Sequence, residues 1–246
     1  MCVRTAGDIA QLGTILFVAA HPDDESFIAA GLLATAVQNG QAVVCVTATR
    51  GEAGSQDTAK WPPSTLGAVR EHELTTALHE LGIHDHVQWN YPDGGCSGVA
   101  LDEAVVRLGA VIAEYRPDTI LTFGPEGMTG HPDHQVVSRW TDMAVADMKQ
   151  RPHIYHAVCT PEQYKRSLQA MDEKLDIYFN IKQPPLIPAA KCAIAYELPA
   201  TICRQKCKAL AAMPSQTELL FRYFSSDFVR QAFASEYFVD ASFNRK

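Results

Sequence analysis

The chain has 246 residues, of which 47% are hydrophobic and 20% charged, and its 21 Lys and Arg against 28 Asp and Glu give a formal net charge of −7. This length and composition are typical of one large globular domain with a substantial core. An acidic chain is a poor binder of nucleic acid or of an anionic membrane. No apolar run reaches the roughly 18 residues that a membrane-spanning helix needs, and the first residues lack a signal-peptide pattern. We therefore expect a cytoplasmic protein.

Apolar, β-rich segments alternate with amphipathic segments along residues 12–150. The pattern predicts strands at 14–20, 42–48, near 87 and at 119–123, with helices at 25–38, 66–81, 101–115 and 132–147. Such alternation is typical of an α/β fold with a doubly wound, mostly parallel sheet. In the Rossmann-like strand order 3-2-1-4, the first and fourth strands lie side by side and their carboxyl ends flank a crevice.

The segment 151–246 is less regular. It predicts strands at 154–158, 176–181 and 193–197, helices at 161–171 and 200–212, and a proline-rich loop at 184–188. No linker separates it from the first segment, so we expect a single domain.

The chain has seven cysteines and no C-x-x-C pair. Cys203 and Cys207 are four residues apart and would share a helix face, a spacing that could serve a soft metal. Reduced thiols in a cytoplasmic protein are the better interpretation, because no histidine or further cysteine is close in sequence.

Two short motifs place histidines and carboxylates directly after predicted strands. Residues 21–25 (HPDDE) follow the first strand, and residues 131–134 (HPDH) follow the fourth. Since the carboxyl ends of these strands meet at one crevice, we expect the motifs to lie together. No G-x-G-x-x-G motif follows the first strand, which disfavours a dinucleotide site.

The residue types of the two motifs indicate a metal site. His21, Asp24 and His134 would leave open coordination positions on zinc, as catalytic sites require. Asp23 is next to a ligand but faces differently, so it could take a proton from metal-bound water. A cationic His131 could stabilise the negative oxygen that forms after attack on a carbonyl.

Each motif also has a simpler interpretation. A histidine at a helix start is often a solvated or capping residue, and Glu25 and Asp133 could be carboxylates that the helix dipole favours. Glu25 could also hold a metal ligand in position without contacting the metal itself. The metal interpretation is favoured because both motifs occur at neighbouring strand ends.

Together the two motifs resemble those of the LmbE/PIG-L family of zinc-dependent N-deacetylases. The similarity extends to a loop, a helix, a second loop and a C-terminal signature, at 49–54 (TRGEAG), 70–82, 91–94 (YPDG) and 208–216. The resemblance implies one domain over 1–246, with the metal-site core at 12–150 and the segment 151–246 completing the substrate pocket.

The resemblance also implies roles for individual residues. His21, Asp24 and His134 would hold zinc, with Fe²⁺ or another divalent metal as alternatives, and Asp23 would be the general base. His131 would stabilise the oxyanion or act as general acid.

Further residues would serve the substrate or support the site. Asp133 would orient His131, and Arg70 and Asp93 would hold sugar hydroxyls. Arg70 could instead be an exposed helix charge paired with a neighbouring glutamate. Glu52 would contact substrate or cap a turn. Many relatives carry a histidine where this chain has Met213, a difference that bears on the acceptor end of the substrate pocket.

The function implied is removal of an N-acetyl group from a GlcNAc-containing small molecule or glycoconjugate. The partner would be a small amide substrate, an N-acetylated amino sugar, while the aglycone and any homo-oligomer stay open. One alternative is a thiol-conjugate amidase on the same scaffold. Another is a non-haem iron oxygenase, since two histidines and a carboxylate also form a facial triad. The third is a non-catalytic metal- or sugar-binding protein, which would not need Asp23.

Overall fold

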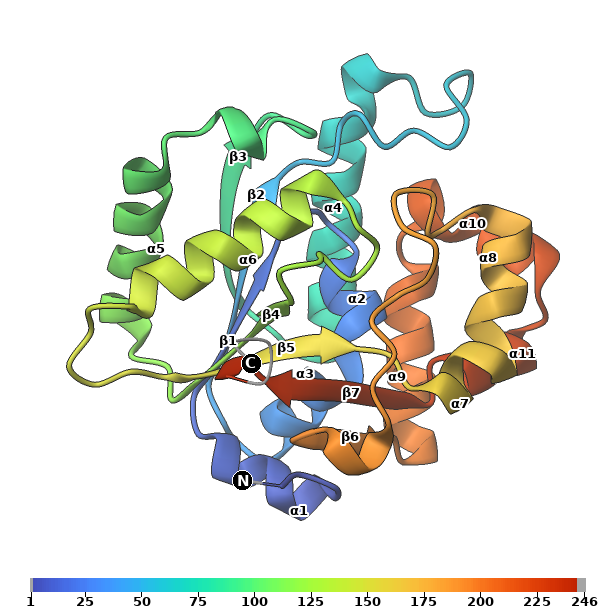
Figure 1. Cartoon of the computed structure of the whole chain (residues 1–246). Helices are drawn as coiled ribbons and strands as arrows, with labels where there is room; N and C mark the ends of the chain where they lie inside the picture. Colours follow the sequence, from blue (N-terminus) through green and yellow to red (C-terminus); the bar gives the residue numbers. More distant parts are fainter. Residues whose placement is uncertain (1, 243–246) are drawn as a thin grey trace.

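A seven-stranded sheet runs through the part of the chain that the computed structural model describes, residues 2–242 (Figure 1). Its strand order is β3-β2-β1-β4-β5-β7-β6. The first five of these pair in parallel, whereas β7 is antiparallel to both of its neighbours. The strands are β1 Ile15–Ala19, β2 Val43–Thr49, β3 Asp85–Tyr91, β4 Thr119–Phe123, β5 His153–Val158, β6 Ile194–Glu197 and β7 Ser235–Asp240. The predicted Rossmann-like α/β sheet with order 3-2-1-4 is therefore confirmed.

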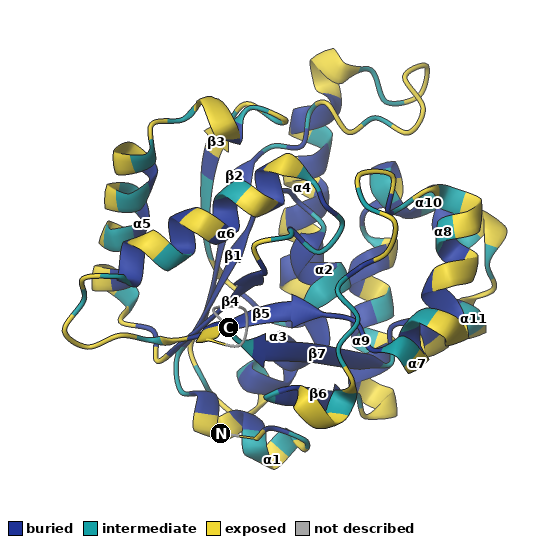
Figure 2. Ribbon diagram, viewed as in Figure 1, coloured by how far each residue is buried: buried dark blue, intermediate teal, exposed yellow. Residues whose placement is uncertain are grey.

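Helices cover both faces of the sheet (Figure 1). On one face lie α5 Leu101–Tyr115 and α6 Pro132–Val145, and on the other lie α3 Ala30–Gln38, α4 Pro63–Leu81 and α9 Ala200–Ala211. The central strands are buried (Figure 2) because both of their faces are covered. Side chains alternate across β1, so Phe17 packs in the α3–α4–α9 core and Leu16 in the α5–α6 core.

The remaining helical segments are short. They are α1 Ala6–Ile9, η1 Ala10–Leu12, α2 Asp24–Ile28, η2 Cys96–Gly98, α7 Pro161–Gln163, the π-helical turn η3 Tyr164–Leu168, α8 Gln169–Leu175, η4 Ala189–Lys191, α10 Pro214–Tyr223 and α11 Ser226–Ala232. Within residues 2–242, no helix combines the length and the apolar character needed to cross a membrane.

The predicted helix at 25–38 is two helices. Ala29, with φ −132° and ψ −3°, leaves the helical conformation between α2 and α3. The amides of Gly31 and Leu32 at the start of α3 then need acceptors, and the Glu236 carboxylate from β7 supplies them at 2.7 and 2.8 Å. A cap from a residue so distant in sequence cannot be read from the local pattern.

The predicted strand at 176–181 is wrong. Asp176 adopts a left-handed conformation, with φ 52°, and ends α8. The carboxylate of Asp172 then accepts a hydrogen bond from the Tyr178 amide at 2.8 Å, which folds this segment back into turns. The pattern also failed to predict α10, α11 and β7.

Candidate metal centre

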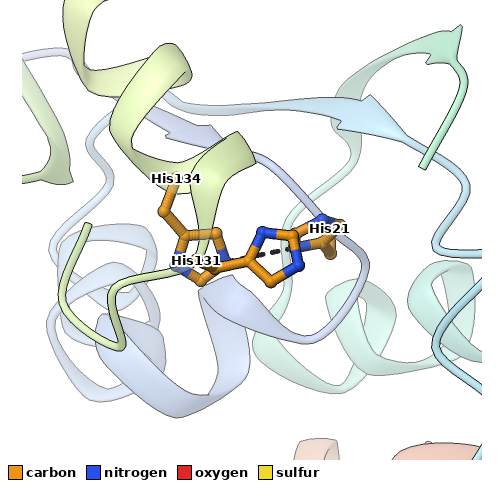
Figure 3. A group of neighbouring side chains, drawn as sticks. All are labelled: His21, His131 and His134. Carbon is orange, nitrogen blue, oxygen red and sulfur yellow. Dashed lines mark hydrogen bonds between the residues drawn. The ribbon is translucent and has the colours of Figure 1, made fainter. Parts of the chain in front are cut away.

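The two histidine motifs meet at the carboxyl ends of β1 and β4, which are neighbouring parallel strands. The first motif leads into α2 and the second begins α6. His21 Nδ1 and His134 Nε2 lie 3.1 Å apart. Figure 3 shows these two side chains together with His131. Two nitrogen ligands of tetrahedral zinc are separated by about 3.3 Å when each Zn–N bond is about 2.05 Å. The spacing of these two nitrogens therefore fits one shared metal ion.

The outer partners of both imidazoles orient them for a metal ligand role. His134 Nδ1 lies 2.9 Å from the Gly127 carbonyl, so its proton is on Nδ1 and the lone pair on Nε2 faces inward. His21 Nε2 lies 3.1 Å from Asp93 Oδ1 and 3.3 Å from Asp133 Oδ2, which places its proton on the outer nitrogen. Either a metal ion or a proton between the two inner nitrogens satisfies both of them at this distance.

Asp24 lies next to both histidines. One of its oxygens accepts the backbone amides of Ala20 and His21, at 3.0 and 2.8 Å. Its other oxygen is 3.4 Å from His134 Nε2. His131 is a further nitrogen donor close by, since the ligand atoms of the three histidines all lie within 4.8 Å of one another.

The pKa values of the two inner histidines reflect this arrangement. Burial lowers the pKa of His21, but hydrogen bonds to Asp133 and Asp93 outweigh that effect and raise it to about 10. The carboxylates around His21 thus favour a positive charge, which a bound metal ion would supply. Burial lowers the pKa of His134 to about 4, which keeps it neutral and able to ligate.

Asp23 lies beside Asp24 with an unusual backbone. Its φ of 112° is in the left-handed region that non-glycine residues rarely adopt, and such strain is often found at functional sites. Glu25 accepts the Asp23 amide at 3.1 Å and Arg70 donates to Asp23 Oδ2 at 3.2 Å. Burial raises the pKa of Asp23 to about 7, although the Arg70 charge opposes the shift. A carboxylate with a pKa near neutrality is suited to exchange protons.

His131 is the N-cap of α6 and accepts the Asp133 amide on Nδ1 at 3.2 Å. This contact leaves a proton on the other ring nitrogen of a neutral His131. Burial and the His21 charge lower the pKa of His131, a direction that favours the neutral ring. A neutral ring can still donate a hydrogen bond from Nε2.

Asp133 contacts both histidines, His21 through its carboxylate and His131 through its backbone amide. Its fully buried carboxylate contacts His21 Nε2 and accepts the Gly94 and Cys96 amides at 2.8 and 3.1 Å. The loop after β3 is thereby joined to α6 and to the first histidine.

Arg70 and Asp93 line the cavity at this centre, but both already form hydrogen bonds or ion pairs with other residues of the chain. Arg70 is buried and donates to the carbonyls of Pro22 and Gly51 as well as to Asp23. It is therefore not the exposed helix charge that the alternative interpretation assumed. Asp93 contacts His21 and accepts the Ala53 amide at 2.9 Å.

Two other expected residues lie away from the cavity lining. Glu52 accepts the Asp93 amide at 3.0 Å, which fits the turn-capping alternative. Met213 is buried in the α3–α4–α9 core and does not line the cavity. Cys203 and Cys207 are free thiols, and no cluster of three candidate metal ligands among residues 2–242 includes them.

Sequence reasoning missed the part that Glu25 plays in holding the Asp23 backbone. Its position directly after the two aspartates was the only available signal. Sequence reasoning assigned the segment 151–246 to the substrate pocket but did not predict the apolar wall, part of which, 176–181, was expected to be a strand.

Comparisons with known proteins give a family match for this chain. The family described as GlcNAc-PI de-N-acetylase, PIG-L, matches residues 16–145, which include both motifs. A curated relative from Saccharomonospora viridis, named 1D-myo-inositol 2-acetamido-2-deoxy-alpha-D-glucopyranoside deacetylase, is 32% identical over 196 residues. That alignment covers 71% of this chain and 73% of the relative.

Solved structures share the fold at low sequence identity. The N,N'-diacetylchitobiose deacetylase from Pyrococcus horikoshii has a TM-score of 0.66 and 18% identity, with 92% of this chain and 83% of that chain covered. GalB, a 4-carboxy-2-hydroxymuconate hydratase from Pseudomonas putida KT2440, has a TM-score of 0.62 and 18% identity, with 86% and 82% covered. Since one fold serves a deacetylase and a hydratase, the fold alone does not decide the reaction. The family match and the curated relative show that this chain belongs to the PIG-L (LmbE-like) family.

Proposed function

We propose that the chain is a zinc-dependent hydrolase that removes an N-acetyl group from a GlcNAc-containing small molecule. The observation that carries the proposal is the pair of inward-facing nitrogens of His21 and His134, 3.1 Å apart, with Asp23 beside them. Curated relatives in the same family are named as deacetylases of a GlcNAc-containing inositol glycoside. The proposal keeps the expected cytoplasmic location.

His21, Asp24 and His134 would hold the metal, for which their two nitrogens and one carboxylate oxygen suit zinc. When bound, the metal polarises the amide carbonyl and makes water more acidic. Fe²⁺ offers the same chemistry with this ligand set, so the metal must be measured.

The chain's own residues carry the proton transfers. Asp23 accepts a proton from the attacking water, whose oxygen forms a bond to the amide carbon. His131 donates a hydrogen bond from Nε2 to the negative carbonyl oxygen. Asp23 then delivers its proton to the nitrogen as the C–N bond breaks, so that acetate and a free amine leave.

The test is acetate release by zinc-loaded protein from methyl 2-acetamido-2-deoxy-β-D-glucopyranoside, compared with cleavage of an N-acetylcysteinyl amide conjugate. Faster hydrolysis of the glycoside supports the proposal, whereas faster cleavage of the conjugate indicates a thiol-conjugate amidase. Oxygen-dependent turnover would indicate an oxygenase, and tight binding without acetate release would indicate a binding protein.

Asp23→Asn makes the assay specific for the mechanism. The variant should retain metal and lose about 10²- to 10⁴-fold in turnover, because an amide is not a base. Asp57→Asn, in the exposed loop before α4, is the matched control and should keep full activity. Full activity in Asp23→Asn would place the general base elsewhere.

A further inference from the structure

The cavity at the metal centre continues well beyond the reacting groups. Its volume is about 660 Å³, and the polar side chains of the centre, among them Asp23, Arg70 and Asp93, line one part of it. Cavities of roughly 300–1,000 Å³ are the size that buries drug-sized ligands. The space thus exceeds what an N-acetylated amino sugar alone would fill.

The far wall of this cavity is mostly apolar, with Lys174 and Asp176 as its charged members. It comes from the segment between η3 and the turn after α8, and from the end of α10, which packs against α8 (Figure 1). Its apolar side chains include Leu168, Met171, Leu175, Ile177, Phe179 and Tyr223. Hydroxyl groups placed against such a wall would lose their hydrogen bonds to water without replacement.

Two aromatic side chains of this wall remain exposed. Phe179 is 69% exposed and Tyr223 is 48% exposed, and they are two of the four exposed large hydrophobic side chains among residues 2–242. The other two, Val106 and Met143, belong to α5 and α6 and do not line the cavity. Single exposed apolar side chains are common, but two at one ligand cavity indicate a binding surface.

Lys174 helps to shape this surface. Its ammonium lies 4.4 Å from the centre of the Tyr223 ring, within cation–π range. The contact joins α8 to the end of α10 and holds the aromatic ring in place.

We propose that the substrate carries an alkyl or aryl group, which binds against the wall formed by Phe179, Tyr223 and the α8 side chains. This inference rests on the proposed function, and it names an apolar conjugate of an N-acylated amino sugar as the substrate class. The amide lies at the polar end of the cavity, and the apolar group extends away from the metal centre. That group is attached either at the glycosidic oxygen or as the acyl chain of the amide.

The experiment compares kcat/KM of zinc-loaded protein for methyl and octyl 2-acetamido-2-deoxy-β-D-glucopyranosides. A parallel arm compares N-acetyl with N-octanoyl methyl glycosides, which separates the two sources of the apolar group. We expect at least a tenfold preference for the octyl form in one arm, since even one methylene in an apolar pocket is worth roughly tenfold or more. Equal values in both arms would overturn the inference.

Variants of the wall residues test whether the wall causes the preference for octyl substrates. In Phe179→Ser/Tyr223→Ser, kcat/KM for the preferred octyl substrate should fall about tenfold more than that for its short-chain counterpart. Val106→Ser replaces an exposed apolar residue outside the cavity and should leave both values unchanged. An octyl preference that survives in the double variant would place the apolar site elsewhere and overturn the assignment.

A second measurement distinguishes failure of the proposed deacetylase function from failure of the inference about the apolar group. If no glycoside is hydrolysed, binding of octyl β-D-glucopyranoside below its micelle concentration still tests the wall by calorimetry. Binding that weakens about tenfold in Phe179→Ser/Tyr223→Ser, and not in Val106→Ser, supports an apolar ligand. If the methyl glycoside is hydrolysed but neither preference nor binding is seen, the deacetylase function stands and this inference fails.

Discussion

Contacts on one face of the ring and at both nitrogens hold His134 in place. Its ring stacks on Phe123 at the end of β4, with 4.0 Å between ring centres and 11° between planes. Its outer nitrogen contacts the Gly127 carbonyl, and its inner nitrogen faces His21. The sequence predicted this inward position because a strand end fixes the motif, but the stacking and the carbonyl partner depend on tertiary structure.

Replacing His134 with Ala should remove the metal and leave the fold. Loss of an outer partner of a ligand costs about 10- to 100-fold in metal affinity, and loss of a ligand should cost more. Metal content after dialysis should fall from one ion per chain to near zero. His153→Ala, an exposed histidine at the start of β5, is the control and should retain the metal. Full occupancy in His134→Ala would show that the ligand set is wrong.

Arg70 illustrates a residue whose position could be predicted but whose contacts could not. Its guanidinium bridges the Pro22 and Gly51 carbonyls and Asp23, and a lysine ammonium cannot reproduce that planar set of donors. We expect Arg70→Lys to lower kcat about 10- to 100-fold by displacing Asp23, with the metal retained.

Arg50→Lys is the matched control, because Arg50 is half-buried, pairs with Glu71 on α4 and does not line the cavity. Steady-state kinetics on the methyl glycoside would distinguish positioning from sugar binding. If KM rises in Arg70→Lys while kcat is unchanged, Arg70 binds the sugar as the resemblance implied.

At the scale of elements, prediction succeeded for segments with local signals. Strand β2 was predicted from a Val-rich run, and α4 from apolar periodicity that ends at Gly82, whose φ of 77° suits a helix cap. Prediction failed where one element depends on a distant one. Glu236 on β7 caps α3 and Lys206 on α9 pairs with Glu236, so none of these three elements shows the arrangement in its own sequence.

The Lys206–Glu236 pair should be essential to the stability of this region. Both side chains are 1% exposed, with 2.7 Å between Nζ and Oε1, and Lys206 also donates to the Phe27 carbonyl at 2.9 Å. Lys206→Met would leave a buried carboxylate without its cation, so the free energy of unfolding should fall by about 3–5 kcal/mol.

Urea denaturation would measure that loss, with Lys208→Met as the control on the same helix. Lys208 is exposed, so its substitution should change the free energy of unfolding by no more than about 0.5 kcal/mol. Equal stability in the two variants would contradict the role given to the buried pair.

At the scale of the whole molecule, the sheet divides into a predictable and an unpredictable part. Strands β1 to β5 are parallel, with at least one helix between each consecutive pair, and the sequence pattern predicts that alternation. Beyond β5, the chain adds the antiparallel strands β7 and β6 and the helices that form the apolar wall of the cavity. The misassigned segment 176–181 lies in this wall, where turn geometry replaced the strand that its composition favours.

Metal binding should stabilise the whole fold, because the ligands come from the ends of two neighbouring strands in the centre of the sheet. A ligand at 100 times its dissociation constant stabilises the native state by about 2.7 kcal/mol. In a chain of this size, each kcal/mol raises Tm by about 2–4 °C, so saturating Zn²⁺ should raise Tm by roughly 5–10 °C over the EDTA-treated protein. Differential scanning fluorimetry would detect this shift, which should vanish in His134→Ala and persist in His153→Ala. A shift of the same size in His134→Ala would mean that zinc stabilises the chain through a site other than the strand-end centre.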